Sequence, residues 1–105
     1  MKRVIAGAPE LVHWLVGRYR LERDPSQVLS IERRAGDLVL MDPEGETSQL
    51  VFVGPRQLAL VAPGNTATEV SSDAELSFPE LHGPAPFVEL QILGGLRLKA
   101  SRVPP

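Results

Sequence analysis

The side chains of this 105-residue chain that could do chemistry are two histidines and scattered serines and carboxylates. His13 falls within an apolar segment and His82 within a turn, so their spacing gives no sign that they converge on a metal ion. Ser72, Asp73 and His82 could be combined into a nucleophilic triad, but the chain lacks the G-x-S-x-G turn that exposes such a serine. We therefore predict no catalytic residue, no metal site and no cofactor, and we expect that the protein is not an enzyme.

The composition argues against several other classes of function. There is no cysteine, so the chain has no disulfide, no thiol nucleophile and no cysteine-based metal site. The formal net charge is -2 and the basic residues form no concentrated face, which argues against nucleic-acid binding. Aromatic residues make up 5%, too few for a stacking platform.

Hydropathy bears on the compartment. No stretch reaches the roughly 20 apolar residues that are needed to span a bilayer. The apolar run that follows Lys2 and Arg3 ends at Pro9, which is too early for an export signal. We expect a cytoplasmic protein with no membrane partner, or a periplasmic or extracellular one if the chain is a fragment of an exported protein.

The first element that could position a site is a short helix. Pro9 suits the first helical turn, Glu10 suits the positive end of the helix dipole, and Gly17 suits the end of the helix. The segment 11–16 is apolar nearly all round, so another element must bury it. Its β-branched and aromatic content leaves a strand as the alternative.

From Arg18 onward the sequence is typical of strands separated by turns. Apolar and polar residues alternate, most cleanly in the last third, and this period of two indicates strands with one face on a core and one in water. Gly36 predicts a tight hairpin, and Gly94-Gly95 predicts a two-residue hairpin loop. The predicted strands are 19–23, 28–34, 38–41, 49–53, 57–61, 74–78, 88–92 and 96–101.

About eight short strands predict an all-β barrel or sandwich, and their short connections predict an antiparallel up-and-down meander. With the N-terminal helix, this predicts a single domain over 1–105. Residues 1–17 form the helix and its lead-in, and 18–103 form the barrel.

Two of the predicted strands are apolar on both faces, 38–41 and 50–53. A strand of this kind needs a second body over its outer face. The N-terminal helix is the candidate that we favour, and a second copy of the chain is the other. The outward residues of these strands are therefore candidate partner contacts: Val39, Met41, Val51 and Val53.

The two large aromatic residues near the first strand are candidates for closing one end of the barrel. Trp14 is the only tryptophan and Tyr19 the only tyrosine. We expect Trp14 to plug the space between helix and barrel rather than to contact a ligand, with Tyr19 beside it and its hydroxyl near the surface.

The chain also resembles a known family. Its G-x-Y sequence at 17–19, its G-D-L-V-L sequence at 36–40, the late Phe78 and the final R-V at 102–103 resemble the small lipocalin-like β-barrel at the C-terminus of serine β-lactamase-like and penicillin-binding-protein-like hydrolases. The resemblance implies a non-catalytic accessory barrel, because the catalytic residues of that family lie in a preceding domain. The resembling segments are 15–21, 28–33, 36–40, 50–55, 74–78 and 100–103.

These observations predict a function in binding or assembly, as an accessory module that binds a protein partner or itself. The alternative is a carrier of a small apolar ligand, since an eight-stranded barrel can be just wide enough for one. The size of the inward residues argues against a cavity: Leu29, Ile31, Leu76, Phe78, Leu90, Ile92 and Leu98.

Overall fold

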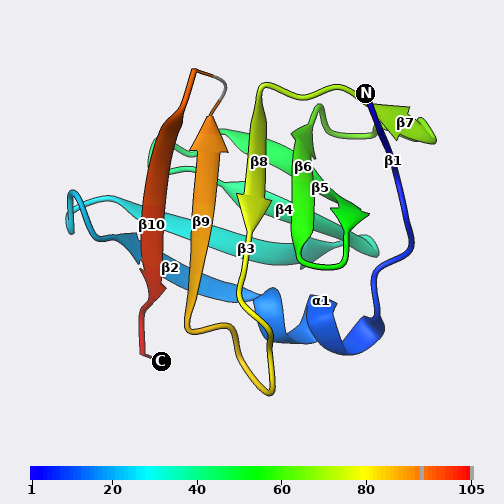
Figure 1. Cartoon of the computed structure of the whole chain (residues 1–105). Coiled ribbons are helices and arrows are strands. Elements are labelled where there is room, and N and C mark those ends of the chain that lie inside the picture. The colour runs from blue at the N-terminus through cyan, green and yellow to red at the C-terminus, as the bar shows by residue number, and fades with distance from the viewer. Residues whose placement is uncertain (93, 105) are drawn as a thin grey trace.

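The computed structural model describes residues 1–92 and 94–104, and its centre is a closed barrel of eight antiparallel strands (Figure 1). The strands follow one another around the barrel in chain order, and β10 returns to pair with β2. A ribbon of β1 and β7 lies outside the barrel. The predicted all-β meander with one short helix is confirmed. The elements are β1 (Lys2–Arg3), α1 (Pro9–Leu15), β2 (Gly17–Leu21), β3 (Val28–Arg34), β4 (Asp37–Met41), β5 (Thr47–Gly54), β6 (Gln57–Val61), β7 (Glu69–Val70), β8 (Ala74–Ser77), β9 (Phe87–Ile92) and β10 (Leu96–Arg102).

The hairpin between β3 and β4 shows how local sequence sets the strand register. Arg34 pairs with Asp37, so only Ala35 and Gly36 form the loop. Both have positive φ, 50° and 86°, as the tightest hairpin turns require. The register that this turn sets places Leu38 and Leu40 on the inner face of the barrel, where both are buried.

Two features of the strand layout differ from the expectations. The ribbon of β1 and β7 was not predicted, because strands of two residues carry no alternation to detect. The connection between β9 and β10 is longer than two residues, because Ile92 pairs with Leu96 and 93–95 lie between them. Both glycines of the predicted Gly94-Gly95 loop have positive φ. Leu93 lies outside the described residues.

Large side chains from the inner face of the strands fill the barrel. Interiors of this kind pack as densely as organic crystals, which leaves little room for a ligand. The buried apolar residues that form one cluster are Leu15, Tyr19, Leu29, Ile31, Leu38, Leu40, Leu50, Phe52, Leu58, Leu76, Phe78, Leu81, Ala85, Val88 and Ala100.

The barrel is less well covered at the end near the connection between β9 and β10. Leu90, Ile92 and Leu98 are inward residues, as predicted, but they are only half-buried. Leu96, which continues the same row, is 43% exposed. The helix lies at the other end (Figure 1).

Helix α1 lies across that other end of the barrel. Leu15 is buried in the core, and Leu11, Val12 and Trp14 pack against it. The helix therefore lies mainly over the end of the barrel, and it reaches the side of β5 through Val12. The N-terminal arm also meets β5, where the amide of Ile5 donates to the carbonyl of Phe52 at 2.8 Å. Within the described residues, no helix is long and apolar enough to cross a membrane.

Candidate functional site

Arg102, the last residue of β10, ties the helix to the barrel. Its guanidinium donates to the carbonyls of Ala85 at 2.6 Å, Trp14 at 2.7 Å and Val16 at 3.1 Å. It also donates to the hydroxyl of Tyr19 at 2.9 Å and lies over the ring of that residue, with its Cζ 5.1 Å from the centroid. The planar fork of arginine suits several acceptors at once. One side chain therefore joins the helix end, the loop before β9, and strand β2.

Trp14 and Tyr19 both lie at this helix-bearing end of the barrel. Trp14 is half-buried against the core, and its carbonyl accepts from Arg102 and from the amide of Ala85. Tyr19 is fully buried. Its hydroxyl, which we expected near the surface, is buried and donates to the carbonyl of Leu15 at 2.6 Å. The residues that carry the G-x-Y and R-V resemblance are therefore in contact with each other.

The buried hydroxyl of Tyr19 should titrate at unusually high pH. Burial raises its pKa to about 12, although the positive charge of Arg102 and the hydrogen bond from it act in the opposite direction. The usual value is about 10. Because the folded pKa is the higher one, the neutral hydroxyl contributes stability that is complete below pH 10 and is lost as the pH rises toward 12.

Tyrosinate absorbance measures this directly, since Tyr19 is the only tyrosine. The absorbance of the native protein should stay flat through pH 10 and rise near pH 12, or with unfolding. A midpoint near pH 10 while circular dichroism still shows the folded barrel would mean that the hydroxyl is solvated.

The residues considered for catalysis and metal binding serve other roles or are exposed. His13 lies on α1 and His82 on the loop after β8, and both are exposed. The hydroxyl of Ser72 bonds to the backbone carbonyls of Leu60 and Ala74, so its bonds are to the main chain rather than to a histidine. Among the described residues, no three histidine, aspartate or glutamate side chains are grouped to hold a metal ion.

The four candidate partner contacts lie on the outer face of β4 and β5, and all are half-buried. The strand register does not bring them into one compact patch. Val39 pairs with Gln49, which is buried, and Met41 pairs with Thr47. Val51 continues the outer row of β5 one step beyond Gln49, so it is a diagonal neighbour of Val39. The register therefore makes Val39 a neighbour of both Val51, across the strands, and Met41, along β4, while Met41 and Val51 lie apart. Val53 lies at the irregularity in the β5–β6 pairing between Phe52 and Gly54.

An open hollow of about 190 Å³ lies beside Val51. The N-terminal arm forms one wall through Val4 and Ile5, and the helix contributes Val12. Ile5 remains 40% exposed at this site. The sequence did not indicate this hollow, because the arm meets β5 only in the folded chain, where Ile5 bonds to Phe52 and Gly7 lies against the Phe52 ring. The remaining lining residues are Gly36, Asp37, Leu38, Gln49, Leu50 and Phe52.

A larger groove of about 460 Å³ opens on the outer face between the β5–β6 turn, the end of β8 and the start of β9. No residue of this groove was predicted as a site. The sequence signal that could have pointed to it is the pair of prolines, Pro55 and Pro79, because prolines interrupt strand pairing. Its lining residues are Pro55, Arg56, Gln57, Ser77, Phe78, Pro79, Phe87 and Glu89.

The geometry defines a closed, side-chain-filled antiparallel barrel that a short helix covers at one end. Comparisons of the chain with protein-family models, with curated proteins and with solved structures find no match.

Proposed function

We propose that this barrel is a non-catalytic module that docks a protein surface, that of a partner or of a second copy, on the outer face of β4 and β5. The observation that carries the proposal is the hollow beside Val51, which is mainly apolar and open to solvent. An exposed apolar depression of this kind often marks an interface. Ile5 at 40% exposure extends the apolar surface beside it.

The size of the hollow favours a protein over a small molecule. At about 190 Å³ it is smaller than the roughly 300–1,000 Å³ typical of ligand pockets. It is comparable with an engineered cavity of about 150 Å³ that holds one benzene molecule. One large apolar side chain of a partner would fill it, and anchors of this kind carry much of the binding energy of an interface.

The accessory character of the module rests on the resemblance at 17–19 and 102–103. Tyr19 and Arg102 bond to each other and to the end of the helix, which is a structural role. With these residues committed to the fold, the outer surface is the part that remains for a partner.

Val51→Lys tests the proposed face. The lysine would place a charge beside the apolar hollow, so the assembled particle should become smaller while the barrel stays folded. Light scattering after size-exclusion chromatography gives the mass of the particle, and circular dichroism checks the fold.

Val28→Lys is the matched control. Val28 is also a half-buried valine on the outer face, but it lies on β3 and pairs with Arg20, away from the hollow. This variant should assemble as the unaltered protein does. A folded Val51→Lys protein of unchanged particle mass would rule out this face as the interface. Unfolding, or exposure of Trp14, would instead mean that the chain itself needs the valine there.

A further inference from the structure

Pro79 ends the pairing of β8 with β9 and leaves part of the sheet without a strand. The ladder between these strands runs from Ala74, opposite Ile92, to Ser77, opposite Glu89. The next residue that could exchange two hydrogen bonds with β9 is Pro79, opposite Phe87. Proline has no N–H and cannot donate to a ladder. Beyond Ser77 the chain turns away from the sheet (Figure 1).

Phe87 therefore has a free backbone edge on the β8 side. The amide of Arg102 donates to the carbonyl of Pro86. The backbone N–H and C=O groups of even-numbered residues of β9 therefore point toward β10, and those of odd-numbered residues point toward β8. Glu89 pairs with Ser77 through the backbone, but Phe87 has no pairing residue in β8. Within residues 1–92 and 94–104, neither the N–H nor the C=O of Phe87 makes a backbone bond on that side.

This free edge opens into the groove of about 460 Å³ described above, which lies within the size range of ligand sites. Pro55, Pro79 and Phe87 give the groove apolar walls. The aromatic ring of Phe87 is held in place from the other side, because the Nζ of Lys99 lies 4.2 Å from its centroid.

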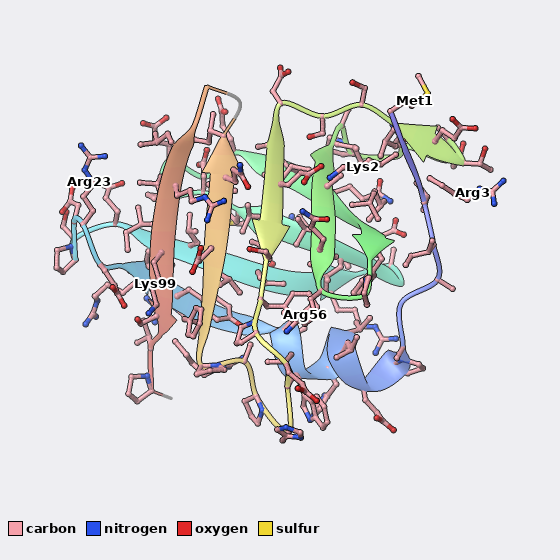
Figure 2. The ribbon with its side chains drawn as sticks, viewed as in Figure 1. Met1, Lys2, Arg3, Arg23, Arg56 and Lys99 are labelled. Carbon is pink, nitrogen blue, oxygen red and sulfur yellow. The ribbon has the colours of Figure 1, made fainter. Side chains whose placement is uncertain are left out.

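The groove also carries unpaired charge. Arg56 is exposed on the turn between β5 and β6 and extends toward the segment that follows β8 (Figure 2). In the part of the chain that the structure describes, its guanidinium has no salt bridge. Glu89 is half-buried in the same groove and likewise has no salt bridge there.

We infer that this groove binds an extended peptide segment of another protein, one that carries an acidic side chain. The peptide continues the sheet where β8 leaves it, exchanging backbone hydrogen bonds with Phe87, as strand addition to a sheet edge does. Its carboxylate pairs with Arg56, and Glu89 keeps the acidic residue at the Arg56 end of the groove by like-charge repulsion. This site is separate from the hollow at Val51, and either can fail without the other.

Selection from a phage-displayed library of random short peptides tests the inference. Peptides enriched on the unaltered protein should share an acidic residue at one position. On Arg56→Glu the same library should yield a basic residue at that position. Arg97→Glu reverses an exposed charge on β10 outside the groove, so it should leave the acidic preference unchanged.

The backbone hydrogen bonds between the peptide and Phe87 can be tested separately. N-methylation at the single peptide residue that exchanges bonds with Phe87 should weaken binding roughly tenfold, equivalent to about 1.4 kcal/mol. N-methylation one residue away should have little effect. The inference is overturned if no sequence is enriched, if the acidic preference survives Arg56→Glu, or if no N-methylated position weakens binding.

Discussion

Replacing Arg102 with methionine is expected to destabilise the barrel by about 3 kcal/mol. Hydrogen bonds from a charged donor are each worth about 1.5–3 kcal/mol, and a buried acceptor left without a partner costs about 1–3 kcal/mol. The carbonyl of Ala85 would lose the bond that it accepts from Arg102 at 2.6 Å. Trp14 would retain the bond from the amide of Ala85, and Tyr19 would retain its bond to Leu15, so the losses are not simply additive.

Urea unfolding followed by Trp14 fluorescence measures this effect, since the only tryptophan lies on the helix that Arg102 holds. Arg102→Lys should recover only part of the stability, because lysine cannot present the planar fork. Arg97→Met removes an exposed arginine of the same strand and should change stability by less than about 0.5 kcal/mol. An Arg102→Met protein within that same limit would show that the helix is held by packing alone.

Leu76→Ala is expected to cost about 2–5 kcal/mol. Leu76 is fully buried on β8, paired with Leu58 on one side and Leu90 on the other. In a filled barrel its truncation leaves a cavity that the rigid strands cannot close. In a barrel that carries a ligand, the side chain would border existing space, and its loss would cost much less.

Leu96→Ala is the control for the same change of volume. Leu96 lies on the inner face of β10 but is 43% exposed, so its truncation should cost less than about 1 kcal/mol. The difference between the two variants separates a packed interior from an open one. Equal, small losses of stability in both would favour the small-ligand carrier over the binding module.

Strands bounded by clear turn residues could be predicted closely. The bounds of β3 and β6 are as predicted, because each lies between turn residues, and β3 also alternates apolar with polar residues. The ribbon of β1 and β7 could not be predicted, since each strand has only two residues and depends on a segment far along the chain.

The segment that covers β4 and β5 could be predicted only in part, for a related reason. The alternation of β5 showed that Val51 needed a neighbour, but not which segment would supply it. The N-terminal arm does so through bonds from Val4 to Thr68 and from Ile5 to Phe52, which are contacts between distant parts of the chain.

The functional surfaces were the least predictable part. In the sequence, Arg102 looks like an ordinary charged residue at a strand end. Its role could not be predicted, because its hydrogen-bond acceptors, the carbonyls of Trp14, Val16 and Ala85, lie far away along the chain. Pro79 is visible as a strand terminator. That it exposes the edge of Phe87 follows only from the register between β8 and β9.

Native mass spectrometry of gently purified protein tests most directly the central claim that this filled barrel works by binding a protein on its outer surface. The predicted result is a species heavier than one 11.4 kDa chain, either a multiple of that mass or the chain with a second protein. A single chain that carries the mass of a small apolar molecule would contradict the claim and favour the ligand carrier instead.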